Sequence, residues 1–407
     1  MLELIINFIL YFFTFLYLYR KEGGFTINSC CFLYISIIAL LGVLIYDTEY
    51  YMWGRFNIYV SHTRNDMSIV PLFFLYVGFM IYYSAIKDIN SKAIGKIVPI
   101  KTWVENTIYY INILLFVITI LSYKDAAFNV ADYLDAYNGD VSDIKVGNGL
   151  GRLGLWSMVI STGLSTSQVL LPFYLLAKKE KKSYVKSGIF LGLYFFSAFI
   201  KGSAIGSRGV FFFAIVNLIF AFIFFRHFLD RRIIRTLTVV FIYIIFILGS
   251  VAILISQDRF GDDFIFRICS YFGEPFNNFP LIYWDYPEFL HGNYLLSSMN
   301  LVELRYLKVG TFYFKTLPGA LYIDFGVIGA ILFLMIYALF FKKILGKVSS
   351  IITMEKLLIY FYFFLGLEFG VFSFSVYGWS GYVILILNYF LFKIGRAKIT
   401  TYITRSE

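Results

Sequence analysis

Arg208 is the residue whose type and surroundings most directly suggest chemistry. It stands in the sequence Gly206-Ser207-Arg208-Gly209, where an apolar run begins. A guanidinium can form paired hydrogen bonds with a diphosphate, and flanking glycines let the backbone approach such a ligand. A cation snorkelling from a tight turn between two helices is the plain structural alternative. Because Lys201 precedes it in the same turn, we favour a diphosphate-binding role for both cations.

Two carboxylates lie inside apolar runs, where an ionisable side chain is costly and normally faces a partner or a cavity. Asp324 occurs in the sequence Tyr-Ile-Asp-Phe-Gly, and Glu368 in Gly-Leu-Glu-Phe-Gly. Several glycines loosen the neighbourhood of Asp324, which favours a role in a site. For Glu368, a structural ion pair with an arginine is the favoured interpretation.

The polar and aromatic stretch 256–315 carries the other candidates for chemistry. Arg267 is set among aromatic residues and is a candidate to meet Arg208 at a shared phosphate. His291 could act as general base toward a sugar hydroxyl, and Glu274 competes for that role. The plain alternative for all of them is a solvated loop side chain. Candidates for binding substrate are Lys201, Arg305, Lys308, Tyr271 and Tyr306, while the remaining aromatic rings suit sugar stacking and an interfacial belt equally well.

Motifs for metals and nucleotides are missing from the sequence. It contains no HExxH, CxxC or DxD pattern, and Cys30, Cys31 and Cys269 lack metal-ligand spacing. No glycine-rich phosphate-binding motif of a nucleotide site occurs in a basic loop. We therefore expect no metal and no cofactor. The energy of a reaction would come from the substrate, such as a diphosphate leaving group, or from an ion gradient.

The elements that must position these residues are membrane helices. The chain is 60% hydrophobic and only 15% charged, with a mean hydropathy of +0.76, which excludes an ordinary soluble domain. A bilayer core needs about 20 apolar residues per helix. We predict an all-α integral membrane protein of about eleven transmembrane helices (10–12), a single polytopic domain over 1–407. The predicted spans are 2–19, 28–46, 68–86, 103–123, 154–177, 184–200, 209–225, 234–255, 317–341, 354–374 and 377–394, with 256–315 as a long external loop between spans 8 and 9.

Loop charges predict the orientation of these spans. If successive loops lie on opposite sides of the membrane, one side holds 23 of the 35 Lys and Arg residues but only 7 of the 25 acidic residues. The positive-inside rule assigns that side to the cytoplasm, so the N-terminus is expected outside and the C-terminus inside. The net charge of +10 is then mostly a topology signal, and we expect no nucleic-acid partner.

The order of these features resembles the Wzy-type oligosaccharide repeat-unit polymerases of O-antigen and capsule assembly. Members have a Gly-Ser-Arg-Gly-like turn opening a mid-chain span, a long external loop, and an aromatic-DFG-x-x-G segment opening the next span. Here these are GSRG at 206–209, the loop 256–315, and GTFYFKTLPGALYIDFGVIGAILF at 310–333. The motifs cover roughly 190–345, and the hydropathy pattern covers the whole chain.

The resemblance implies a GT-C-like, metal-independent glycosyltransferase. It would move a glycan from undecaprenyl diphosphate onto a lipid-linked repeat unit at the outer face of the bacterial cytoplasmic membrane. Membrane lipid and a chain-length regulator are candidate partners. By position, Arg208 matches the turn arginine of the family, and Arg267 matches a loop arginine more loosely. Asp324 matches the DFG aspartate, whose role stays unassigned.

Two alternatives stay open. An O-antigen ligase would use the same donor. Ligases typically have a catalytic histidine in a large external loop, and His291 is compatible with that role. A repeat-unit flippase or another transporter would usually have two related halves and broken spans, and the sequence contains no such halves. We rank the polymerase first, then the ligase, then the transporter.

Overall fold

The computed structural model of the 407-residue chain divides into two compact units. Both are assembled from separate segments, and the expected single domain over 1–407 stays a prediction. Unit 1 comprises Met1–Ala93, Ile265–Ser349 and Ile359–Trp379, and unit 2 comprises Ile94–Phe264, Ser350–Leu358 and Ser380–Glu407. The structure describes residues 1–46, 67–127, 151–205, 208–260, 264–284, 289–298, 315–348, 350–372, 379–397 and 402–405.

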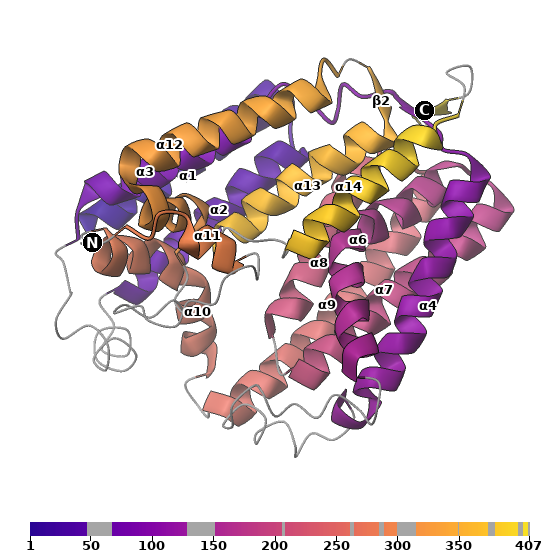
Figure 1. Cartoon of the computed structure of the whole chain (residues 1–407), viewed down its shortest axis with the longest axis horizontal. Coiled ribbons are helices and arrows are strands. Elements are labelled where there is room, and N and C mark those ends of the chain that lie inside the picture. Colours follow the sequence, from indigo (N-terminus) through magenta and orange to yellow (C-terminus); the bar gives the residue numbers. More distant parts are fainter. Residues whose placement is uncertain are drawn as a thin grey trace. The chain divides into compact units, whose positions relative to one another are not determined.

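The regular elements described in unit 1 are all helices, and helix α12 lies alongside α3, which also packs on α1 (Figure 1). It contains α1 (Leu2–Lys21), α2 (Ile27–Tyr46), α3 (Ile69–Tyr83), nearly all of α10 (Phe264–Asn278), the π-helical turn η4 (Phe279–Tyr283), α11 (Asn293–Ser298), α12 (Leu317–Leu345) and most of α13 (Met354–Gly370).

Unit 2 combines a helical bundle with a short sheet, and its helices α4, α6 and α7 pack on one another (Figure 1). It contains α4 (Thr102–Ala127), α6 (Gly151–Ala177), α7 (Lys181–Ile205), α8 (Arg208–Phe225), α9 (Arg231–Phe260) and α14 (Trp379–Ile394), together with β1 (Lys96–Val98), β2 (Ile351–Thr353) and β3 (Ile403–Thr404).

All of the apolar segments predicted from the sequence coincide with helices. Within the described residues, six helices are long and apolar enough to cross a membrane, and four shorter ones are also apolar. A helix is the expected form because it satisfies every backbone N–H and C=O within the segment, as the bilayer core requires. The largely α-helical membrane architecture is thus supported, and the number of spans stays a prediction.

The stretch predicted as a long loop, 256–315, is largely helical where the structure describes it. Helix α9 runs on to Phe260, and α10, η4 and α11 follow. Residues 276–283 are all buried. Aromatic and apolar side chains spaced along α10 and η4 supply a face that packs into unit 1, which explains why a polar-looking segment folds. Its placement on the external side of a membrane stays a prediction.

A three-stranded sheet in unit 2 was not predicted. Strand β1 is central, with β2 parallel on one side and β3 antiparallel on the other. Lys96 is in register with both Ile351 and Thr404. Strands of two or three residues are too short to produce a periodic pattern in a sequence.

Helices α2 and α10 cross with their backbones in close contact at two glycines. A Cβ at Gly273 would lie 2.7 Å from the backbone nitrogen of Gly42 and 2.8 Å from the carbonyl oxygen of Leu41. The side-chain amide of Asn277 donates to the carbonyl of Gly42 at 2.9 Å. The crossing therefore needs a glycine at position 273.

We expect Gly273→Ala to lower the free energy of unfolding by about 1–3 kcal/mol, because the added methyl group meets backbone atoms that cannot rotate away. Thermal unfolding in detergent measures this loss. Gly188→Ala is the matched control, since nothing lies within 4 Å of a Cβ there. Equal midpoints for the two variants would show that α2 and α10 can separate without cost.

Candidate functional site

Helix α12 is broken at Gly326, and the break organises the site. Gly326 has φ 67° and ψ −175°, a combination open essentially only to glycine. At the break, the carbonyl of Ile323 accepts from the backbone N–H of Leu290, and that of Asp324 accepts from the N–H of His291, both at 3.0 Å. The segment that precedes α11 is therefore docked on the backbone of the broken helix.

The carboxylate of Asp324 holds the first turn of α11. Its two oxygens accept from the backbone N–H groups of Tyr294 at 2.9 Å and Leu295 at 2.7 Å. These N–H groups have no partner within their own helix, so Asp324 caps α11 from another element. Asp324 is fully buried. This geometry suits a residue that positions the segment around His291 better than a base that exchanges protons with substrate.

His291 lies at the turn between this docked segment and α11. Its φ is 50°, a left-handed conformation that few residues other than glycine adopt, and Gly292 follows with φ 91°. The side chain of His291 is exposed. Strained backbone around a solvent-facing imidazole, fixed from both sides by Asp324, is an arrangement found at functional sites.

Lys315 is a buried cation beside Asp324. It is 1% exposed, and its Nζ lies 4.1 Å from the ring centroid of Tyr294 and 5.3 Å from that of Tyr283. Its backbone N–H donates to the carbonyl of Phe372 at 3.1 Å. Burial lowers the pKa of Lys315 to about 7, against the opposing effect of the negative charge on Asp324. Two aromatic faces and one carboxylate thus surround an ammonium that can gain or lose its proton near neutral pH.

The lowered pKa of Lys315 predicts a pH-dependent stability. Between about pH 7 and its ordinary value of 10.5, the unfolded chain holds a proton that the folded chain lacks, so the free energy of unfolding should rise with pH across this window. The melting temperature of the wild type, measured relative to that of Lys315→Met, should therefore increase between about pH 7 and pH 9. Parallel pH curves for the two proteins would contradict the lowered pKa.

Aromatic rings next to the break pack on one another. Trp284 and Tyr322 are stacked with centroids 4.9 Å apart, and the Tyr322 hydroxyl donates to the Trp284 carbonyl. Phe279 and Phe289 meet the Tyr322 ring at 5.4 and 5.9 Å. Phe279 and Trp284, considered equally for sugar stacking and for an interfacial belt, here contact Tyr322 and so join η4 to α12 next to the break.

Tyr271 and Glu274, predicted in an open loop, lie in helix α10. The ring of Tyr271 stacks on Phe372 with centroids 6.3 Å apart, and Glu274 is 3% exposed. Glu274 therefore lies in the interior of unit 1, and Tyr271 is partly buried there. Glu368, on α13, is fully buried, and neither of its oxygens has a hydrogen-bond partner within the described residues.

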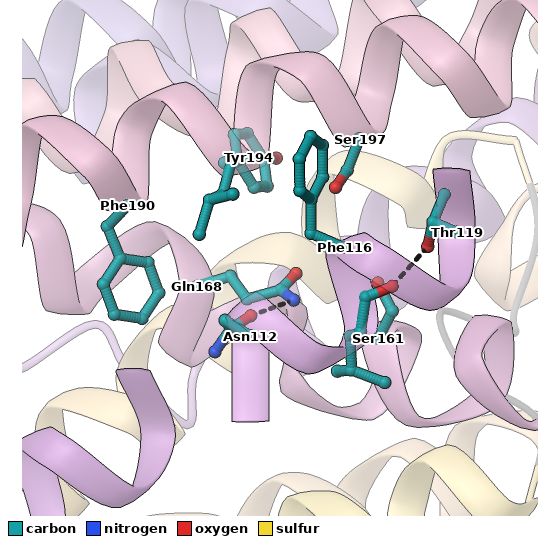
Figure 2. Close-up of a pocket in the computed structure, with 10 residues that line it drawn as sticks. Asn112, Phe116, Thr119, Ser161, Gln168, Phe190, Tyr194 and Ser197 are labelled. Atoms are coloured by element: carbon teal, nitrogen blue, oxygen red, sulfur yellow. Dashed lines mark hydrogen bonds between the residues drawn. The ribbon is translucent and has the colours of Figure 1, made fainter. Parts of the chain in front are cut away.

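Lys201 belongs to unit 2, near the end of α7. Its Nζ donates to the Ser161 hydroxyl on α6 at 2.8 Å. Ser161 also lines a cavity of about 20 Å³ between α4, α6 and α7, large enough for about one water molecule. Figure 2 shows Asn112 and Gln168 facing each other there, with the Gln168 amide donating to Asn112 Oδ1. The bond to Ser161 gives Lys201 a structural contact between α7 and α6, and its substrate-binding role stays a prediction.

The other predicted site residues are only partly placed. Arg208 begins α8 in unit 2 and Arg267 lies in α10 of unit 1, and their side chains are outside the described part of the structure. Arg305, Tyr306 and Lys308 fall entirely outside the described residues. Among the described residues, no group of three or more His, Cys, Asp or Glu side chains could hold a metal ion.

Lys315 was not among the site residues predicted from the sequence. One signal was available: it comes directly before Thr316, Leu317 and Pro318, a capping residue and proline that start a helix. The structure thus brings Asp324, His291 and Lys315 together.

Comparisons with protein-family models, curated proteins and solved structures found no match.

Proposed function

We propose that the chain is a membrane-embedded glycosyltransferase that joins undecaprenyl-diphosphate-linked oligosaccharide repeat units at the outer face of the cytoplasmic membrane. The product would be an O-antigen or a capsular polysaccharide. The observation that carries the proposal is that Asp324, at the break in α12, holds the turn with the exposed His291 and also acts electrostatically on the buried cation Lys315. A cation and a candidate base are what transfer from a diphosphate needs.

The proposed reaction is a displacement at the anomeric carbon of the donor. An acceptor sugar hydroxyl forms the new C–O bond, its proton passes to His291, and the bond to the lipid diphosphate breaks. Lys315 stabilises the negative charge that develops on the departing diphosphate. Because an adjacent diphosphate favours the ammonium form, binding of the donor would be accompanied by proton uptake at Lys315.

Asp324 has a positioning role in this proposal. It fixes α11 and the turn that carries His291, while its negative charge lies beside Lys315. Arg208 and Arg267 stay predicted phosphate ligands, each to be tested by substitution.

The orientation, with the N-terminus outside and the C-terminus cytoplasmic, is part of the proposal. It is supported by contacts between basic segments that the alternation assigns to one side. Strands β1, β2 and β3 come from three of these segments. An ion pair between Lys179 Nζ and Asp230 at 2.8 Å links two more.

An O-antigen ligase is the second candidate, favoured by one observation: His291 is exposed and held at a strained turn. A transporter is favoured by the broken helix α12, since discontinuous helices often carry transport sites. However, the carbonyls of Ile323 and Asp324 freed by the break already accept backbone N–H groups.

A gel profile of surface polysaccharide from a deletion strain separates these functions. The strain is complemented with the wild type, Arg208→Ala, His291→Ala, or Lys343→Ala as an exposed-lysine control. Lipid A-core capped with a single repeat, without a ladder, establishes a polymerase. Polymer left on undecaprenyl diphosphate with bare core identifies a ligase, and lipid-linked units trapped inside identify a flippase.

The variants then test the residues. We expect His291→Ala to remove the ladder while the protein remains in the membrane at wild-type level, since it truncates one exposed side chain. A normal ladder from His291→Ala would eliminate it as the base, and one from Arg208→Ala would make the turn arginine structural.

A further inference from the structure

A shallow, open groove lies along the exposed face of α1 toward the end of that helix, and its described lining comes from α1 alone. Its volume is about 560 Å³, and it is lined by Phe13, Leu16, Tyr17, Arg20 and Lys21. Phe13 and Tyr17 are 63% and 61% exposed, so the groove is open at the side. Its lining changes from apolar to cationic over about two helical turns, which matches the change from acyl chain to headgroup in a phospholipid.

The cationic end of this groove is reinforced by neighbouring groups. Lys21 Nζ lies 5.6 Å from the ring centroid of Tyr17, so the ammonium group lies next to this aromatic ring at the end of the groove. Lys92, from the segment after α3, donates to the carbonyl of Gly23 in the turn after α1. Arg20 and Lys21 are both exposed.

The acid at this end of α1 faces away from the surface. Glu22 is 7% exposed, and its carboxylate accepts from the Asn28 amide at 2.8 Å and from the Thr26 hydroxyl. Asn28 is held in turn by hydrogen bonds with the carbonyl of Ile89 and the hydroxyl of Tyr360. Glu22 is therefore fixed inside unit 1 and does not cover the cations.

The other acid in the neighbourhood is already paired. Asp88 forms an ion pair with Lys342 at 2.8 Å, and this hydrogen bond, with the charges of Lys87 and Lys21, lowers the pKa of Asp88. The described surface around the groove end therefore carries an excess of positive charge.

We infer that this groove binds an anionic glycerophospholipid. One acyl chain lies along Phe13, Leu16 and Tyr17, and the headgroup phosphate contacts Arg20 and Lys21. The charge complementarity is direct, because a phosphate meets two exposed cations whose neighbouring acids are buried or paired. The site is distinct from the cluster around Asp324 and does not depend on the proposed reaction.

Native mass spectrometry of the full chain in detergent tests the site. The protein is titrated with dioleoyl phosphatidylglycerol and, separately, with dioleoyl phosphatidylcholine. We expect the wild type to retain the anionic lipid in preference. Arg20→Ala/Lys21→Ala should weaken phosphatidylglycerol binding about tenfold or more, since each cation near an anionic lipid surface contributes substantially.

Lys343→Ala/Lys347→Ala is the matched control, because it removes two exposed cations from the same unit. We expect it to bind phosphatidylglycerol as the wild type does. The single substitution Lys21→Gln, with an intermediate loss, covers the case in which the double variant does not fold. Equal retention of both lipids by the wild type, no loss in Lys21→Gln, or equal losses in the control would each overturn the inference.

Discussion

Gly326→Ala should destabilise the protein by about 1–3 kcal/mol and release the segment before α11, because alanine cannot adopt the φ and ψ of this position without strain. A Cβ there would also lie 3.1 Å from the Phe289 ring. Relief of the strain would extend α12 as a regular helix. The carbonyls of Ile323 and Asp324 would then return to their own helix and leave the N–H groups of Leu290 and His291 without partners.

Two measurements follow this change. Thermal unfolding in detergent reports the loss of stability, and limited proteolysis reports cleavage near 289–295, where the docked segment becomes accessible. Gly249→Ala is the control, since nothing lies within 4 Å of a Cβ at that position. A wild-type midpoint and cleavage pattern in Gly326→Ala would mean that the break does not hold the segment.

Asp324→Ala should lower the free energy of unfolding by about 3 kcal/mol, which is the second large effect that we expect. It leaves the N–H groups of Tyr294 and Leu295 without their acceptors and removes the nearby negative charge from the buried Lys315. Asp324→Asn should cost less, because an amide still offers one oxygen to α11. Polymer assembly should fall in the same order if Asp324 positions the turn of His291.

The graded series distinguishes positioning from proton transfer. A catalytic base would lose its function equally in both variants, whereas a cap should be partly rescued by asparagine. Asp88→Asn is the control for loss of one carboxylate, and we expect it to change stability by less than about 1 kcal/mol because its ion pair with Lys342 is exposed. Equal losses in Asp324→Asn and Asp324→Ala would contradict the capping role.

The apolar helices were predictable because each contains a long apolar run, which the hydropathy along the sequence reveals. The predicted span 184–200 is shorter than the 25-residue helix α7 to which it corresponds, because lysines near the ends of this helix lower the hydropathy there. The short strands were missed because two or three residues have no measurable period. The helices within 256–315 were missed because their polar residues outweighed an apolar face that becomes visible only in three dimensions.

The candidate site was predicted in part. Asp324 and His291 were chosen for their residue types, and the structure joins them through backbone bonds that no spacing in the sequence reveals. Lys315 was missed because its surroundings include Tyr283 and Tyr294, which precede it in the chain by 32 and 21 residues. Arg208, the leading candidate from the sequence, stays a prediction.

The register of β1 with β3 sets an order of assembly during synthesis. Lys96 pairs with Thr404, so the central strand leaves the ribosome on the order of 15–60 s before its antiparallel partner exists. Helices α4 to α9 are synthesised during that interval, and the edge of β1 that pairs with β3 lacks its partner until Thr404 has been made. Pairing of β3 with β1 then completes the sheet and joins segments that were synthesised at different times. A translational pause between residues 98 and 403 would lengthen the exposure of that edge without altering the folded protein.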